Sequence, residues 1–131
     1  MALSFSPGSF DLIVSSMALH HLTDPEKPVL YERIHDWLKP GGLFRCADET
    51  LALPPAAHEA NLIHWEKWAR ENGASQEEII LWSEHAEKYD HYAPLMLHCE
   101  WLKEAGFINV DCHWRKLMWT VFGGQKRLSE A

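Results

Sequence analysis

The sequence FDLIVSS at residues 10–16, followed by MALHHL at residues 17–22, decides the fold class. A run of aliphatic and β-branched residues without a turn signal is typical of a strand that is buried on both faces of a sheet. In an open α/β sheet, ligands bind beyond the carboxyl ends of the strands. The residues just after this strand are therefore the first candidates for a binding site.

The composition is that of a single folded domain spanning residues 1–131, with 47% hydrophobic residues and a formal net charge of −7. No apolar run reaches the roughly 18 residues of a membrane span, so we expect a soluble, cytoplasmic protein without a membrane partner. The negative charge argues against nucleic acid as a partner, because binding phosphates requires clustered cations. Cys46, Cys99 and Cys112 are too far apart for a zinc motif and are expected to be buried free thiols.

A helix and a second strand follow the first strand. The sequence Thr23-Asp24-Pro25-Glu26 has the form of a capping box with Thr23 as the N-cap, and the sequence Lys39-Pro40-Gly41-Gly42 is expected to end the helix. The next strand is predicted over residues 43–47. A strand, a helix and a strand with short connections predict a parallel pair, so this strand would deliver Asp48 and Glu49 to the sheet edge where the first strand ends.

The middle of the chain, about residues 54–92, is predicted to be a helical insertion. One helix is expected over residues 56–71, and a second begins at Ser75, where Ser75 and Glu78 form another capping box. These helices are rich in tryptophan and histidine and follow the carboxyl end of a strand. We expect them to cover the ligand crevice as a lid. The alternative, which applies more often to any single tryptophan, is that these side chains simply anchor the helix pair to the rest of the domain.

The last third is predicted to contain a helix from Pro94 and two strands. Residues 108–114 alternate between apolar and polar side chains, which indicates a strand near the sheet edge, whereas residues 117–122 are continuously apolar, which indicates an interior strand. Only Arg115 and Lys116 separate the two strands, so an antiparallel hairpin is expected.

Taken together, the segments FDLIVSSMALHHLTDP, WLKPGGLF, WLKEAGF and the two closing strands resemble the C-terminal half of a class I S-adenosylmethionine-dependent methyltransferase. The resemblance implies a partial Rossmann-like α/β sheet, parallel except for one antiparallel strand, with helices on both faces. In this family the last strand is antiparallel and inserted between the fifth and sixth. The chain would then supply the fourth to seventh strands of the family's sheet.

The family holds its cofactor with a glycine-rich turn after the first strand and an acidic residue at the end of the second. Neither precedes Phe10, and Gly41-Gly42 ends a helix rather than starting one. We therefore expect S-adenosylmethionine to be a cofactor only if the fold is completed. Three hypotheses remain open: a truncated methyltransferase copy that is inactive alone, a non-catalytic binding or scaffolding remnant, and one half of a split enzyme.

Candidate site residues lie at the strand ends and in the predicted lid. The resemblance implies that Ser15, Ser16 and Met17 would line the methionine part of the cofactor. His20 or His21 is the candidate base, because an imidazole titrates near neutrality, although a histidine at this position more often serves packing. Candidate substrate contacts are Asp48, Glu49 and Trp65, and an acceptor that is a small molecule is favoured.

Two further expectations concern metals and partners. The spacing of His64, His85, His91 and His98 matches no standard ligand pattern, so no metal is expected. The strand over residues 10–16 has no pairing partner on one side within the chain. An unpaired apolar edge favours pairing with another copy of the chain or with a complementing N-terminal fragment.

Overall fold

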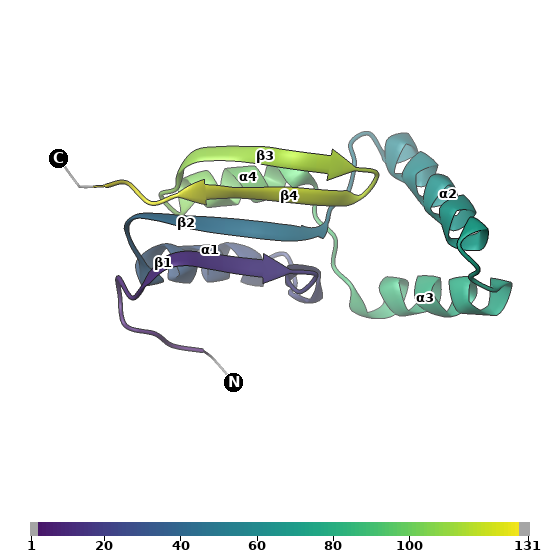
Figure 1. Ribbon diagram of the computed structural model, residues 1–131, viewed down its shortest axis with the longest axis horizontal. Helices are drawn as coiled ribbons and strands as arrows, with labels where there is room; N and C mark the ends of the chain where they lie inside the picture. Colours follow the sequence, from purple (N-terminus) through teal and green to yellow (C-terminus); the bar gives the residue numbers. More distant parts are fainter. Residues whose placement is uncertain (1–2, 129–131) are drawn as a thin grey trace.

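The computed structural model describes residues 3–128 and forms one mixed sheet with five helical segments (Figure 1). The elements follow one another in the order β1 (Phe10–Ser16), η1 (Leu19–His21), α1 (Glu26–Trp37), β2 (Leu38–Glu49), α2 (Pro55–Glu71), α3 (Gln76–Tyr89), α4 (Leu95–Glu104), β3 (Ile108–Lys116) and β4 (Trp119–Gln125).

The four strands lie side by side in the order β1-β2-β4-β3. β1 is parallel to β2, and β4 is antiparallel to both of its neighbours, so β4 alone runs against the other three strands. This topology confirms the parallel pair formed by β1 and β2 and the antiparallel hairpin formed by β3 and β4. It also confirms that the strand predicted over residues 108–114 lies at a sheet edge and that the last strand is inserted between two earlier ones. Finally, it confirms that β1 is an edge strand whose only partner within the described residues is β2.

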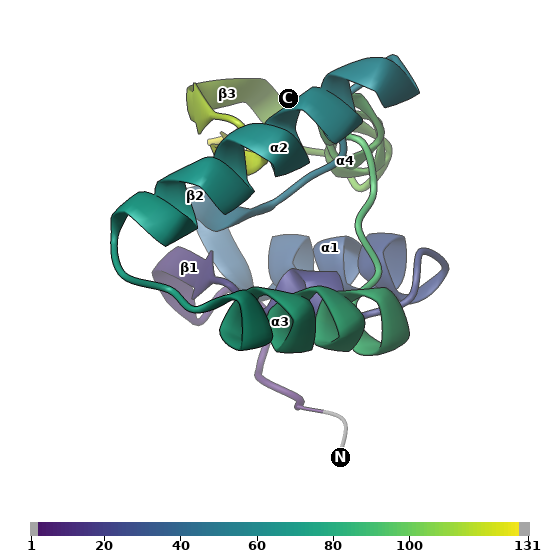
Figure 2. The same cartoon turned by 90° about the vertical axis from the view of Figure 1, so that its right-hand side faces the viewer.

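The two helices that pack on the sheet, α1 and α4, lie on the same face of it (Figures 1 and 2). Their contact encloses the core, where the buried side chains of Phe44 and Phe122 from the sheet meet Tyr31 and Leu102 from the helices. The expectation of helices on both faces is therefore wrong for the described residues. Only the apolar stripes of α1 and α4 are available to cover the sheet, because the remaining two helices extend beyond its end.

β1 is not buried on both faces, contrary to its sequence pattern. Ile13 packs against the core, whereas Leu12 and Val14 are 54% and 67% exposed. These two side chains point to the face that no helix covers. A strand with an apolar centre thus lies at an open corner of the sheet, with both a free edge and a free face.

The sequence predicts the capping interactions at the start of α3 correctly and those at the start of α1 only in part. α3 begins with the complete capping box: the Ser75 hydroxyl accepts from the Glu78 amide, and the Glu78 carboxylate accepts from the Ser75 amide. At α1 the Glu26 carboxylate accepts from the Thr23 amide and hydroxyl, which lowers the pKa of Glu26. The N-cap is Pro25, however, so the assignment of Thr23 as N-cap is wrong.

Two strand boundaries also differ from the prediction. β2 begins at Leu38, directly after α1, and continues through the Pro40-Gly41-Gly42 sequence because Gly41 takes a φ of +81°, a conformation that glycine adopts without steric cost. The hairpin turn consists of Leu117 and Met118 rather than Arg115 and Lys116. Leu117 has a φ of +54°, which reverses the chain there.

The thiols are free, as expected, but only Cys46 is fully buried; Cys99 and Cys112 are partly exposed. Burial raises the pKa of Cys46 far above its usual range, so this thiol remains protonated. It belongs to the core rather than to a reactive site.

The helices α2 and α3 extend past the carboxyl end of β2 and lie in front of the sheet's end when it is viewed along the strands (Figure 2). None of the helices within residues 3–128 combines the length and apolar character that crossing a bilayer requires.

Candidate functional site

The carboxyl ends of β1 and β2 bring His20 and Asp48 together. β1 is followed by the short helical turn η1, and Asp48 is the next-to-last residue of β2. The His20 Nδ1 atom lies 2.5 Å from Asp48 Oδ1, and the His20 amide donates to Asp48 Oδ2 over 3.0 Å. Both side chains are buried. The carboxylate therefore fixes the position of the imidazole and leaves its Nε2 atom directed elsewhere.

A second carboxylate, Asp90, lies on the Nε2 side of this imidazole. Its Oδ1 atom is 3.8 Å from His20 Nε2 and 3.1 Å from His21 Nδ1, and its Oδ2 atom accepts a 2.8 Å hydrogen bond from the Tyr92 hydroxyl. Burial, followed by the charge of Glu49, raises the pKa of Tyr92 beyond its normal range. The phenol thus remains neutral beside the carboxylates of Asp90 and Glu49.

The segment that carries Asp90 and Tyr92 is held in place by a buried lysine. Lys27 is fully buried, and its ammonium group donates to Asp24 Oδ1 over 2.8 Å and to the carbonyl oxygen of His91. The His91 amide donates in turn to the His20 carbonyl oxygen over 2.6 Å. These bonds attach the segment after α3 to both η1 and the start of α1, which positions Asp90 beside His20.

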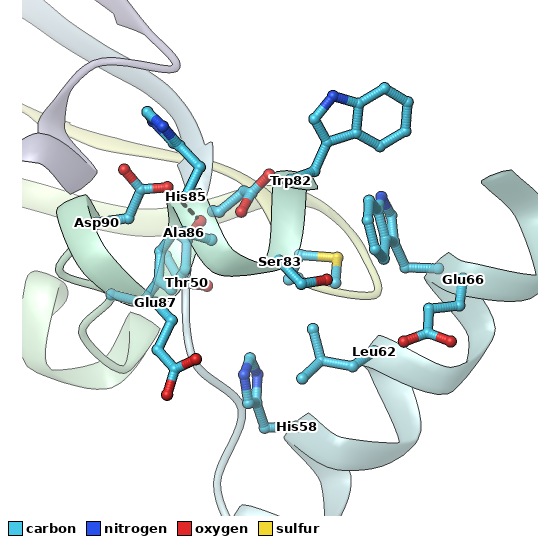
Figure 3. Close-up of a pocket in the computed structure, with 14 residues that line it drawn as sticks. Thr50, His58, Leu62, Glu66, Trp82, Ser83, His85, Ala86, Glu87 and Asp90 are labelled. Carbon is cyan, nitrogen blue, oxygen red and sulfur yellow. Dashed lines mark hydrogen bonds between the residues drawn. The ribbon is translucent and has the colours of Figure 1, made fainter. Parts of the chain in front are cut away.

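A cavity of about 700 Å³ opens between α2, α3 and the end of β2 (Figure 3). Its volume is within the usual range for small-molecule sites. The lining combines aromatic, acidic and histidine side chains. It consists of Glu49, Thr50, His58, Leu62, Trp65, Glu66, Trp82, Ser83, His85, Ala86, Glu87, Asp90, Tyr92 and Met118. Asp90 connects the cavity to the histidine pair, since it lines the first and contacts the second.

The structure brings together only some of the predicted site residues. His20, His21 and Asp48 form one cluster, and Glu49 and Trp65 line the cavity. The two predicted substrate residues Asp48 and Glu49 therefore have different surroundings. Asp48 binds His20, whereas Glu49 lines the cavity.

The predicted cofactor residues lie at the end of β1, outside the cavity lining. The pairing of Ser15 with Cys46 places it on the core face, where its hydroxyl hydrogen-bonds the thiol. Ser16 and Met17 are exposed. Met17 has a φ of +50°, which is rare for a residue with a side chain, and strained conformations of this kind concentrate at binding sites.

Sequence reasoning missed Asp90 and Tyr92. A polar cluster directly after a predicted helix, Asp90-His91-Tyr92, was the available signal. It was not sufficient, because the position of this segment depends on contacts with residues far away in the sequence, Lys27 and His20.

One group of side chains in the described part of the chain could hold a metal ion. Donor atoms of His20, His21 and Asp90 all lie within 4.8 Å of one another. It includes none of His64, His85, His91 and His98, whose sequence spacing matches no ligand pattern. The fold brings this set together, since Asp90 lies about 70 positions after the two histidines along the chain.

The chain is similar to a family model and to two curated proteins. Residues 1–42 match the family model described as a methyltransferase domain. The chain is 41% identical over 46 residues to an uncharacterized methyltransferase, sll0829, from Synechocystis sp., which corresponds to 35% of this chain and 22% of that protein. It is 28% identical over 104 residues to a carboxy-S-adenosyl-L-methionine synthase from Desulforapulum autotrophicum, or 79% of this chain and 42% of that one.

Solved structures extend the similarity to almost the whole chain. Human N-acetylserotonin methyltransferase in complex with S-adenosylmethionine superimposes with a TM-score of 0.60 at 17% identity, covering 95% of this chain and 31% of the human protein. The chain thus spans less than half the length of these curated and structural relatives.

Proposed function

Because the chain has the fold of the class I S-adenosylmethionine-dependent methyltransferases, we propose that it is part of an enzyme that methylates a small molecule. The shared fold, the methyltransferase family match over residues 1–42 and the cavity beside the strand ends support this proposal. The observation that carries the assignment of residues is the His20–Asp48 pair, which lies at the edge where α/β enzymes bind ligands.

S-adenosylmethionine supplies, when bound, a methyl group on a positively charged sulfur that is already activated for displacement. The protein is then left to orient the acceptor, exclude water and remove a proton. His20 suits the last task, because Asp48 occupies its Nδ1 and leaves Nε2 as the atom that can accept a proton. Glu49 and Trp65 would contact the acceptor in the cavity.

The exposed end of β1 fits the cofactor in part. Ser16 and Met17 lie at the carboxyl end of the strand, and the left-handed backbone at Met17 turns the chain away from the sheet. We assign Ser16 and Met17, whose side chains are exposed, to the methionine part of the cofactor. Ser15 would contribute to this site only through its backbone, because its hydroxyl faces the core and bonds Cys46. These residues offer only part of a binding surface, so the 131-residue chain is expected to bind S-adenosylmethionine more weakly than about 100 μM.

The test is an NMR titration of the ¹⁵N-labelled chain with S-adenosylmethionine. The amide signals of Ser16 and Met17 should shift progressively and revert on dilution, because binding is weak and exchange is fast. Asn109 is the control, since it also has a left-handed backbone but lies at the opposite end of the sheet. A titration that leaves both amides unchanged would refute the assignment, and tight binding would show that the site in this chain is complete.

A further inference from the structure

The cavity is lined by acidic residues and, among the described residues, by no lysine or arginine. Its carboxylates are those of Glu49, Glu66, Glu87 and Asp90. Glu66 is half-exposed and lies 3.6 Å from Arg70, so part of its charge is offset. Asp90 differs because its side chain is 7% exposed. A buried carboxylate retains a strong field, since little water screens it.

Three buried side-chain polar atoms of the described residues form no hydrogen bond, and all three belong to residues that line this cavity. They are Thr50 Oγ1, His58 Nδ1 and Asp90 Oδ1, the last of which lies 3.1 Å from His21 Nδ1 without the geometry of a hydrogen bond. Buried polar atoms are nearly always satisfied, so an unsatisfied group calls for an explanation. The concentration of these atoms around one space indicates that a ligand with hydrogen-bond donors completes them. Each of the three can act as an acceptor.

Aromatic rings form a further part of the lining. The rings of Trp65 on α2 and Trp82 on α3 are 6.3 Å apart at an interplanar angle of 62°, so they present differently oriented faces. Tyr92 lines the cavity near Asp90. Electron-rich ring faces attract organic cations, and carboxylates beside such rings add to the attraction. The carboxylates of this lining would repel an anion, whereas both the carboxylates and the ring faces would attract a cation.

We propose that this cavity binds the methyl acceptor as an organic ammonium cation, so that the acceptor is an amine. This inference rests on the proposed methyltransferase function. Asp90 is the charged contact, and Trp65 and Trp82 contact the alkyl part of the ammonium ion.

The reaction then needs a proton acceptor, because an ammonium nitrogen has no free electron pair. The N–H proton passes to His20 Nε2, which lies 3.8 Å from Asp90 Oδ1 at the edge of the cavity. The freed nitrogen lone pair forms the new bond to the methyl carbon as the carbon–sulfur bond breaks, and that electron pair remains on sulfur. The product nitrogen is again a cation, and His20 releases its proton to water.

The test compares two ligands of the same shape: choline, a quaternary ammonium ion that probes cation binding but has no N–H and cannot itself be methylated on nitrogen, and its uncharged carbon analogue 3,3-dimethylbutan-1-ol. Both are titrated into the full chain by calorimetry, with EDTA present to remove metal ions from the histidine pair. We expect choline to bind about tenfold more tightly than the neutral analogue. Asp90→Asn and Trp65→Leu should each remove most of this preference. Glu84→Gln on α3 and Trp114→Leu on β3, which do not line the cavity, should preserve it.

Equal binding of the two ligands, or no binding of choline, would overturn the inference. Near-ultraviolet circular dichroism establishes that each variant is folded, and the Trp65→Leu variant provides the answer if Asp90→Asn unfolds. The S-adenosylmethionine titration separates the two proposals: a choline preference without cofactor binding would refute the assignment of the cofactor site and leave the cation site intact. If Asp90→Asn weakens the binding of S-adenosylmethionine but not of choline, the cavity holds the sulfonium cation, and the amine assignment is wrong.

Discussion

At the scale of single residues, the core contains a histidine whose neutral form is favoured by the fold. The Tyr31 hydroxyl lies 2.6 Å from His98 Nδ1, and both side chains are buried. Burial, together with the charge of Lys27, lowers the pKa of His98 from 6.5 to about 4. The neutral imidazole can accept a hydrogen bond from the tyrosine at Nδ1, whereas the imidazolium cannot.

This low pKa predicts a loss of stability in mild acid. The unfolded chain takes up a proton at this histidine near pH 6.5, and the folded chain only near pH 4. The free energy of unfolding should therefore fall by up to about 3 kcal/mol as the pH decreases from 6.5 to 4. Above pH 6.5 His98 is neutral in both states and adds no pH dependence to the stability. Denaturant titrations at several pH values measure the effect.

A His98→Gln variant serves as the comparison, because glutamine can accept from Tyr31 but does not titrate. Its stability should vary less with pH than that of the wild type, while a His64→Gln variant on exposed α2 should behave like the wild type. If the pH dependence of His98→Gln equals that of the wild type, the acid sensitivity arises elsewhere in the chain.

Individual site residues could be predicted where local sequence determines their position. His20 follows β1, and Asp48 lies at the end of β2. Because these two strands are parallel, their carboxyl ends lie at the same edge of the sheet. Asp90 and Tyr92 could not be placed this way, because the buried ammonium group of Lys27 positions them. A lysine at the start of an amphipathic helix gives no sign in the sequence that it is buried.

At the scale of secondary-structure elements, the contact between β2 and β4 depends on a glycine. Gly123 of β4 pairs with Arg45 of β2. A Cβ atom at this position would collide with the Phe44 carbonyl oxygen and lie 3.2 Å from the Arg45 Cα atom. Both obstacles are backbone, so neither can move without separating the strands.

Gly123→Ala should therefore destabilise the domain by about 3 kcal/mol or more, because the two central strands must move apart. Gly73→Ala provides a matched control: this glycine has a φ of +94° but no neighbouring atom within 4 Å of the added carbon. Its cost should be only the backbone strain, about 1 kcal/mol. Thermal unfolding of both variants measures the difference, and equal melting temperatures would contradict the proposed collision.

The elements themselves were predicted where the determinants are local. The α3 capping box, the helix from Pro94 and the closing hairpin each depend on neighbouring residues. The burial of β1 was not predicted correctly, since an apolar run has the same pattern whether a second layer covers it or not. The course of β2 through Pro40 and Gly41 was missed for a related reason: pairing with β1 at Phe10 and Leu38 outweighs the local turn signal.

At the scale of the whole molecule, β1 presents an open edge and an open face together. β2 pairs with one side of it, and the other side is free among the described residues. Leu12 and Val14 expose apolar surface beside the free backbone groups. Natural sheets usually protect such edges with charged residues or a covering element. This arrangement supports the proposal that a second strand pairs here.

We predict that the chain self-associates through β1 at micromolar concentration, because a second copy provides both backbone partners and apolar cover for this strand. Sedimentation velocity should show a species larger than the monomer. Val14→Lys should shift the population toward the monomer, since charged lysines are a common means of preventing edge pairing. Val29→Lys on α1 replaces a similarly exposed valine away from the edge and should not change the sedimentation. A wild-type chain that sediments only as a monomer would exclude self-pairing and favour a complementing fragment as the partner of β1.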